Sequence, residues 1–272
     1  MISSTRNPWI KALRLLHQAK GRRQHGCFLV EGTHLLQEAI ATGWPLSAVC
    51  FTEAWAQRNA ETLARVPANA RQQVVDPQVL DALATTQTPD GVVAVAERKH
   101  PGDGDAKVNL AIALETVGDP GNAGAIVRTA AAAGSDRVWL SADSVDPEHP
   151  KVLRASAGQW FRLPPQVAES LPDLVVKCRD RGMQVLAAAM PREDEPARIC
   201  WEVDFTRPTL LLLGNEGAGL SRDLVRLADA CVQIPMAAGV ESLNVAIAGS
   251  VLLYEARRQR WAAENAENSR RI

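Results

Sequence analysis

Five short apolar runs in the second half of the chain constrain its fold more than any other feature of the sequence. Each run is continuous and does not alternate with polar residues, which is typical of strands buried on both faces of a parallel sheet. The runs cover residues 110–114, 138–140, 185–190, 210–213 and 232–236. Helical patterns lie between them at 124–133, 150–158, 171–182 and 222–228, and a long final helix is expected over 242–261. This half of the chain predicts an α/β domain with a parallel sheet.

The first half repeats this alternation on a smaller scale. Helices are expected over 7–20, 31–42 and 53–65, strands over 46–51, 72–75 and 91–96, and a short apolar run covers 27–30. Residues 100–105 carry no apolar side chain and are rich in Pro, Gly and Asp, which is typical of a domain boundary. We therefore predict a smaller α/β domain at 1–99, a linker at 100–107, a larger domain at 108–262 and a polar tail at 263–272.

Cysteine and histidine usage indicates the compartment and argues against a metal. The five cysteines are an odd number, widely scattered and without a CxxC pair, and the five histidines are equally dispersed. This usage is typical of reduced thiols in the cytoplasm, with neither a disulfide framework nor a zinc site. No apolar run approaches the roughly 18 residues that span a bilayer, and residues 1–7 lack the pattern of a signal peptide. We expect a cytoplasmic protein without a metal or a membrane segment.

The net charge of −1 conceals a basic stretch at the start of the chain. Residues 1–30 contain no acidic side chain and carry six cations: Arg6, Lys11, Arg14, Lys20, Arg22 and Arg23. Salt screens charges beyond about 8–10 Å, so a phosphate responds to such a local patch and not to the net charge. The stretch predicts an RNA-binding surface, and a solvated basic helix face is the alternative.

Three loop segments, at 115–130, 212–221 and 233–246, each follow a predicted strand. Ligands of open α/β sheets bind beyond the carboxyl ends of the strands, so this placement favours a site. In the first segment, Asn122 stands where the cap of the next helix is expected. Arg128 follows in a helix of small and apolar residues, where it needs an anionic partner or a wet cavity. A simple cap and an arginine paired with a carboxylate remain the alternative for this segment.

The second and third segments are weaker signals when each is taken alone. Gly214, Gly217 and Gly219 leave a loop whose backbone N–H groups could hold a ligand, but the spacing fits neither a P-loop nor a dinucleotide fingerprint. Ser242 and Asn244 stand where the final helix begins, a position at which such residues commonly serve only as caps. No Ser–His–Asp or Cys–His set and no glycosidase-like carboxylate pair accompanies these segments.

Taken together, the three segments resemble a known family. They read N-x-G-x(3)-R from Asn122, L-G-N-E-G-x-G-L from Leu213, and I-P-M-x(5)-S-L-N-V-A from Ile234. In order and spacing they resemble the signature motifs of the SpoU (TrmH-like) RNA ribose 2′-O-methyltransferases of the SPOUT superfamily, over residues 108–260. The first 100 residues resemble the L30e-like substrate-binding domain of many such enzymes, through residues 7–16 and 28–32.

The resemblance implies a parallel sheet with a deep trefoil knot near its carboxyl end, a homodimer formed through the knotted domains, and S-adenosylmethionine as cofactor. It places cofactor binding at Leu213, Gly214, Glu216, Ile234, Met236, Ser242 and Leu243. It places catalysis at Asn122, Arg128, Glu216, Ser242 and Asn244. It gives Asn215 no role.

The implied chemistry suits these residue types. A ribose 2′-hydroxyl must be aligned with the activated methyl group, and its proton must be removed or dispersed. Arg128 would hold a nearby phosphate and polarise the hydroxyl, although a guanidinium pKa above about 12 leaves proton acceptance by this residue open. Asn122 would orient Arg128 or the ribose, and Glu216 and Asn244 would fix the geometry. Ribosomal RNA is the expected substrate; tRNA and a catalytically silent RNA-binding protein are the alternatives.

Overall fold

The computed structural model describes residues 1–99, 107–190 and 197–269, which form two compact units. The first unit joins Met1–His100 with Glu148–Arg162, and the second joins Pro101–Pro147 with Leu163–Ile272. Most of the predicted linker, residues 100–106, lies outside the described residues. Each unit is described by itself.

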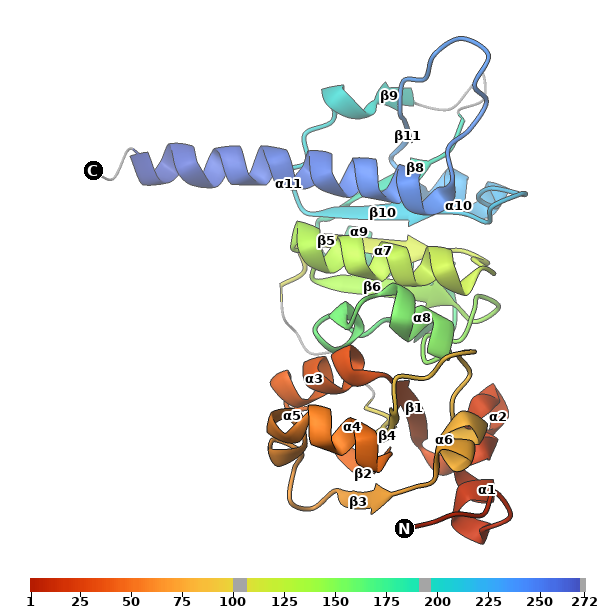
Figure 1. Ribbon diagram of the computed structural model, residues 1–272. Coiled ribbons are helices and arrows are strands. Elements are labelled where there is room, and N and C mark those ends of the chain that lie inside the picture. Colours follow the sequence, from red (N-terminus) through yellow and green to blue (C-terminus); the bar gives the residue numbers. More distant parts are fainter. Residues whose placement is uncertain (100–106, 191–196, 270–272) are drawn as a thin grey trace. The chain divides into compact units, whose positions relative to one another are not determined.

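The first unit is a small mixed sheet with short helices (Figure 1). Its strands are β1 (Cys27–Glu31), β2 (Leu46–Phe51), β3 (Arg71–Val74) and β4 (Val92–Glu97). They lie in the order β1-β4-β2-β3, where only the β2–β3 pair is parallel. Its helices within the first hundred residues are α1 (Pro8–Arg14), α2 (Ala19–His25), α3 (Thr33–Ala41), α4 (Glu53–Arg58), α5 (Ala60–Ala64) and α6 (Pro77–Leu83). The sequence pattern missed α6, which begins at a proline after the capping Asp76.

The amino-terminal helix is broken where the sequence predicted one helix over 7–20. After α1 the chain forms a 3₁₀ turn, Leu15–His17, and then α2. Gly21, which follows the predicted helix, lies inside α2, where a Cβ atom would come within 2.0 Å of the Leu15 carbonyl oxygen. Asn7 caps α1, because its Oδ1 accepts from the backbone N–H groups of Trp9 and Ile10 at 2.9 and 3.4 Å.

Residues 148–162 pack with the first unit, although they follow β6 of the second in the chain. This segment contains α8 (Pro150–Ala155) and a 3₁₀ turn, Gln159–Phe161. Arg154 Nη1 lies 2.8 Å from Glu31 Oε2, and Trp160 and Phe161 pack against Phe28 at ring-centroid distances of 5.1 and 6.5 Å. The compact units of the structure therefore differ from the predicted domain 108–262 at this segment. Because this segment directly follows a strand of the second unit, the sequence did not indicate that its aromatic side chains complete the core of the first unit.

The second unit is built on a seven-stranded sheet in the order β7-β6-β5-β10-β8-β11-β9. Its strands are β5 (Leu110–Leu114), β6 (Arg137–Ser141), β7 (Gln166–Ala168), β8 (Gln184–Ala188), β9 (Ala197–Ile199), β10 (Thr209–Leu213) and β11 (Ala230–Gln233). Every pairing among these described strands is parallel, as the continuous apolar runs predicted. The two strands that the sequence missed, β7 and β9, have three residues each and no apolar run.

The helices of this unit are α7 (Pro120–Ala133), α9 (Leu171–Asp180), α10 (Arg222–Leu227) and α11 (Val245–Ser269). Helix α11 packs along α7 and continues beyond the sheet of its own unit (Figure 1). It starts later and ends later than the predicted 242–261, so the expected polar tail at 263–272 is helical as far as Ser269. The buried side chains of α11 include Val245, Ala246, Leu252 and Leu253, whereas Ala248 and Val251 are half-buried.

Candidate functional site

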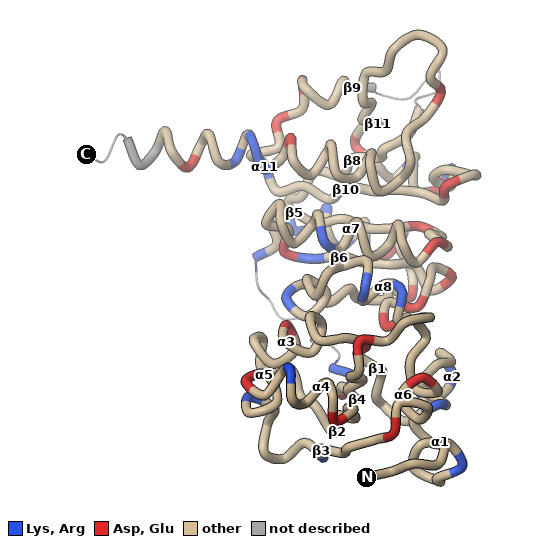
Figure 2. The backbone as a smooth tube through the Cα atoms, in the orientation of Figure 1, with Lys and Arg blue, Asp and Glu red and all other residues tan. Residues whose placement is uncertain are grey.

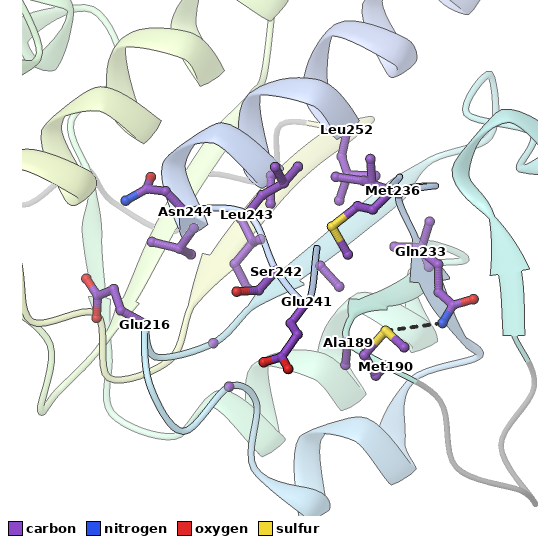
Figure 3. A pocket seen from close by; sticks show the side chains of 18 of the residues that line it. Ala189, Met190, Glu216, Gln233, Met236, Glu241, Ser242, Leu243, Asn244 and Leu252 are labelled. Atoms are coloured by element: carbon purple, nitrogen blue, oxygen red, sulfur yellow. Dashed lines mark hydrogen bonds between the residues drawn. The ribbon is translucent and has the colours of Figure 1, made fainter. Parts of the chain in front are cut away.

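A cavity of about 700 Å³ opens where neighbouring strands of the parallel sheet end. The last residues of four strands line it: Ala188 of β8, Ile199 of β9, Leu213 of β10 and Gln233 of β11. The loops that follow β10 and β11 and the first turns of α11 complete the wall (Figure 3). A carboxyl-end site is where the sequence placed the ligand. All seven residues expected to bind the cofactor line the cavity: Leu213, Gly214, Glu216, Ile234, Met236, Ser242 and Leu243.

The loop after β10 closes upon itself. The backbones of Asn215 and Gly219 exchange two hydrogen bonds of 3.0 Å. A Cβ atom on Gly214 would lie 2.2 Å from the backbone of Gly219 and Leu220, much closer than any real contact. Glycine at 214 is therefore required by the loop's own backbone, before any ligand is considered.

Asn215, to which the sequence gave no role, organises this loop. Its Oδ1 accepts from the backbone N–H groups of Gly217 and Ala218 at 2.9 Å each, and its Nδ2 donates to the Thr116 carbonyl at 2.8 Å. The residue thus shapes its own loop and ties it to the loop after β5. An Asn two residues before a Gly is a common turn pattern, and that local signal could have identified it.

Three of the expected catalytic residues form one hydrogen-bonded line at the rim of the cavity. Asn244 Nδ2 donates to Asn122 Oδ1 at 3.0 Å, and Asn122 Nδ2 donates to Glu216 Oε1 at 3.0 Å. These residues come from three segments that lie far apart in the sequence. The structure thereby brings the three sequence motifs together through side chains.

The caps of the two helices at the rim differ from the prediction in one respect. Asp119, and not Asn122, caps α7, because Asp119 Oδ1 accepts from the Asn122 backbone N–H at 2.9 Å. The Asn122 side chain is thereby left for the rim. Asn244 does cap α11, since its Oδ1 accepts from the Ala246 N–H at 2.9 Å while its Nδ2 contacts Asn122.

Glu216 is held as a carboxylate. Partial burial raises its pKa, but hydrogen bonds from the Asn122 amide and from the backbone N–H groups of Glu216, Asp119 and Gly118 outweigh this and lower it. The rim therefore carries a fixed negative charge at neutral pH. Glu241 adds a second carboxylate to the cavity lining (Figure 3).

The two remaining catalytic candidates lie differently. Ser242 lines the cavity, and its side chain is exposed there. Arg128 lies in the middle of α7, outside the residues that line the cavity, and is exposed. It makes no hydrogen bond or ion pair with any residue that the structure describes. Within the described part of the chain, neither an ion pair nor the cavity described above explains this residue.

Thr116, a residue with a strained backbone, connects the loops that form the site. Thr116 has a φ of +52°, which is unusual for a β-branched residue. Its backbone N–H donates to Ser141 Oγ at 2.8 Å, and its hydroxyl donates to Asp143 Oδ2 at 2.8 Å. Hydrogen bonds from Ser141 and Thr116 lower the pKa of Asp143, so this carboxylate stays ionised as their acceptor. Because the Thr116 carbonyl holds Asn215, the loops after β5, β6 and β10 are locked together.

Figure 2 marks the Lys and Arg positions of the amino-terminal helices in blue, and not all of these side chains are exposed. Arg6, Lys11, Arg14, Lys20 and Arg23 are exposed, as an RNA-binding surface requires. Arg22 is 1% exposed and was wrongly included, because its Nη1 donates to the carbonyls of Leu16 and His17 at 2.9 and 3.0 Å. Arg22 thus donates to carbonyl groups that have no helical partner at the 3₁₀ turn. Helical periodicity in the sequence did not reveal this break between α1 and α2.

The described residues show no group of three or more side chains able to hold a metal ion. No helix in this part of the chain is both long and apolar enough to cross a bilayer. All five cysteines are free, and burial raises the pKa of the Cys50 thiol to about 12.

Comparison with known proteins accounts for both units. Residues 109–254 match the SpoU rRNA Methylase family, and residues 7–94 match the MRM3-like substrate binding domain. The chain belongs to the SpoU rRNA methylase family. Membership implies the trefoil knot, and the α/β fold on a parallel sheet agrees with it.

Relatives of this SpoU methylase cover different shares of the chain. An uncharacterized tRNA/rRNA methyltransferase of Synechocystis is 47% identical over 96% of this chain and 95% of its own length. The 23S rRNA (guanosine(2553)-2′-O)-methyltransferase of Bacillus subtilis is 30% identical over 94% and 98%. The tRNA (guanosine(18)-2′-O)-methyltransferase of Escherichia coli is 34% identical but covers 57% of this chain and 66% of its own.

A solved structure carries a ligand that bears on the cavity. The SpoU methyltransferase AviRb of Streptomyces viridochromogenes, in complex with the cofactor AdoMet, superposes with a TM-score of 0.82. It is 32% identical, and the match covers 94% of this chain and 98% of that one.

Proposed function

We propose that this SpoU methylase transfers the methyl group of S-adenosylmethionine to a ribose 2′-hydroxyl of ribosomal RNA. One observation carries the proposal: Asn122, Glu216 and Asn244, one from each motif, form a hydrogen-bonded line at the rim of a cavity at the carboxyl ends of the strands. This arrangement argues against a silent RNA-binding protein, because such a protein has no chemical reason to keep the set.

The cavity suits the cofactor in size and in chemistry. Its volume of about 700 Å³ lies within the range of small-molecule sites. Leu213, Ile234 and Leu252 offer apolar walls, and the carboxylates of Glu216 and Glu241 offer negative charge to a cationic sulfonium. The cofactor-binding role of Leu213, Gly214, Glu216, Ile234, Met236, Ser242 and Leu243 is thus supported by position. When bound, S-adenosylmethionine supplies an activated methyl group.

The residues of the rim act by holding the acceptor ribose. Glu216 fixes the amide of Asn122, so that this amide presents one defined face. Asn244 fixes the same amide from the other side, and Ser242 offers a hydroxyl toward the cavity. Side chains held in this way orient a hydroxyl without reorganising during the reaction. Arg128 holds the neighbouring phosphate and polarises the 2′-hydroxyl, so that negative charge developing on its oxygen is stabilised.

The position of Arg128, exposed and outside the lining of the cavity, supports a site completed by a second subunit. Exposed apolar side chains recur along α11 at Ile247, Tyr254 and Trp261, which are 54%, 54% and 58% exposed. Residues seven positions apart share one helix face, which is the pattern of a helix–helix interface. We propose a homodimer through this face of the knotted domain. Arg128, on the neighbouring α7, then serves the cavity of the partner subunit.

Ribosomal RNA is favoured over tRNA by the extent of the relatives. The relative named for 23S rRNA matches both units, whereas the relative named for tRNA matches only 57% of the chain. The first unit therefore belongs with the rRNA enzymes, and its exposed cations Arg6, Lys11, Arg14, Lys20 and Arg23 bind the RNA. We place the protein in the cytoplasm, together with this substrate.

Methyl transfer from labelled S-adenosylmethionine to purified ribosomal RNA and to tRNA tests the proposal. We expect label in ribosomal RNA, and ribose-methylation mapping should locate one 2′-O-methyl group. Label in tRNA alone would select the second substrate. No label in either RNA, with the cofactor bound, would favour the silent protein.

A further inference from the structure

A guanidinium group lies over an indole ring in the first unit, and neither residue is among the cations considered above for RNA. Arg71 Cζ lies 3.8 Å from the centroid of the Trp9 ring. Arg71 is the first residue of β3, a strand at the edge of the four-stranded sheet, and Trp9 lies in the first turn of α1. The contact therefore joins the sheet edge to the amino-terminal helix.

The guanidinium of Arg71 is held by two contacts. Its Cζ lies over the indole ring, and Arg71 Nη2 donates to Gln73 Oε1 at 2.9 Å. Trp9 is half-buried and packs against the hydrophobic core, whereas Arg71 is exposed. A flat cation that is already held on one side by an aromatic ring thus remains accessible to solvent.

Such a surface is chemically suited to an unpaired nucleobase. Arginine planes stack on bases, as aromatic rings do, and a preoriented plane loses little side-chain entropy on binding. A phosphate would instead bind the N–H edge of the guanidinium, where Nη2 already has a partner in Gln73. A base on the open face of Arg71 would therefore use a contact that a phosphate at the N–H edge does not use.

The charges around the stack favour an anionic polymer. Lys11 and Arg14 are exposed on α1, and the chain has no acidic residue before Glu31. Helix α6, which contacts α1, carries the exposed Asp81 and is preceded by its capping residue Asp76. Asp76 is engaged as a cap, since its Oδ1 accepts from the Gln78 N–H at 3.0 Å.

We propose that the outer face of Arg71, stacked on Trp9, binds an unpaired nucleobase of the RNA, while Lys11 and Arg14 attract its phosphates. This inference rests on the proposed function, because it assumes that the partner is RNA. It assigns to the first unit a contact that depends on bases as well as on charge.

Two RNA probes separate stacking from charge. The full-length protein is titrated with a fluorescent single-stranded oligouridylate of about 12 nucleotides and with an abasic ribose-phosphate chain of the same length. The wild type should bind the oligouridylate more tightly. Both Arg71→Ala and Arg71→Lys should weaken its binding by about 5- to 20-fold, and Arg71→Lys should bind the abasic chain as the wild type does.

Lys99→Ala is the matched control, because it removes a cation that lies 5.4 Å from the Trp44 ring centroid in the same unit. It should leave the preference for bases intact. Equal binding of both probes by the wild type would overturn the proposal. So would unchanged oligouridylate binding in both Arg71 variants, with only a lower melting temperature, since the stack would then be purely structural.

The methyl-transfer assay separates this outcome from a failure of the proposed function. If the wild type methylates ribosomal RNA while the Arg71 variants bind the oligouridylate normally, only the present inference fails. If the wild type methylates no RNA, the proposed function fails, whatever the Arg71 variants do.

Discussion

The polar residues of the cavity rim and the cations of the amino-terminal helices are held in opposite ways. At the rim, Asn122, Asn215 and Glu216 each bond to side chains or backbone of another segment at 2.8–3.0 Å. Among the described residues, the side chains of Lys11, Arg14, Lys20 and Arg23 make no hydrogen bond or ion pair. The rim is preorganised for chemistry at one place, whereas the cations act through their field on a polymer.

This difference predicts sharp losses from single changes at the rim and graded losses from changes among the cations. Gly214→Val should cause the largest single effect, a loss of detectable cofactor binding, because a Cβ atom there would lie 2.2 Å from the backbone of Gly219 and Leu220. Isothermal titration with the full chain measures it. Gly217→Ala is the control, since a Cβ at 217 would meet only Asn215 Oδ1 at 3.6 Å, and most affinity should remain. Normal binding by the valine variant would show that the loop is not preorganised.

Arg128→Ala should come next, with a decrease of about 10²–10³-fold in kcat and nearly unchanged cofactor affinity. Arg128 lies outside the lining of the cavity, so the cofactor should not sense its loss. Arg128→Lys should rescue poorly, because a point charge cannot replace a planar fork on phosphate. If the residue serves the partner's cavity, a mixed dimer of Arg128→Ala and Gly214→Val subunits should keep one working site. Full activity of Arg128→Ala would contradict the assigned role.

The cations should respond additively. Changing Lys11, Arg14, Lys20 and Arg23 to Gln should raise the RNA dissociation constant by about 10–100-fold and reduce its salt dependence, with cofactor binding untouched. The contrasting variant is Arg22→Gln, which leaves the Leu16 and His17 carbonyls without their donor and should lower the melting temperature. An unchanged salt slope in the fourfold variant would mean that these cations form only a solvated face.

The smallest effect is expected from Asp143, which accepts a hydrogen bond from Thr116. Asp143→Asn should lower kcat by about 3–10-fold, because it weakens the hold on strained Thr116 and so on Asn215. Asp204→Asn is the matched control: Asp204 also accepts from a threonine hydroxyl, that of Thr206, but neither residue lies in the loops after β5, β6 and β10. Introducing Thr116→Gly, which permits the positive φ, should make the loss of Asp143 nearly silent. A full loss in that background would mean that Asp143 acts by another route.

The pH dependence of stability gives a second measurement of Asp143. Its folded-state pKa lies below the ordinary value, so its carboxylate stabilises the fold at neutral pH, and this contribution is lost as the pH falls through the lowered pKa. The melting temperature of Asp143→Asn should therefore differ from that of the wild type at neutral pH and approach it in acid.

The packing of residues 148–162 with the first unit determines which fragments of the protein are suitable for experiments. A fragment covering residues 105–272 carries Trp160 and Phe161 without the Phe28 and Trp44 rings that cover them. Such a fragment exposes aromatic surface, so experiments on cofactor binding belong on the full chain.

Much of the site could be predicted from the sequence, because its strands and loops are defined by residues that lie close together in the chain. Continuous apolar runs identified the central strands of the parallel sheet, and the motifs from Asn122, Leu213 and Ile234 identified the loops that meet at their ends. Residue type and spacing are enough for this, since strand burial and loop chemistry depend on neighbours in the chain.

Only the tertiary structure decided which partner each of these side chains contacts. It gave Arg22 to the 3₁₀ turn and not to RNA, gave Asp119 the cap expected of Asn122, and made Asn215 the organiser of the loop. It also moved residues 148–162 into the first unit. Each of these depends on a donor, an acceptor or a ring brought close by folding from elsewhere in the structure. A buried polar group takes the partner that lies within reach, and periodicity along the chain does not contain that distance.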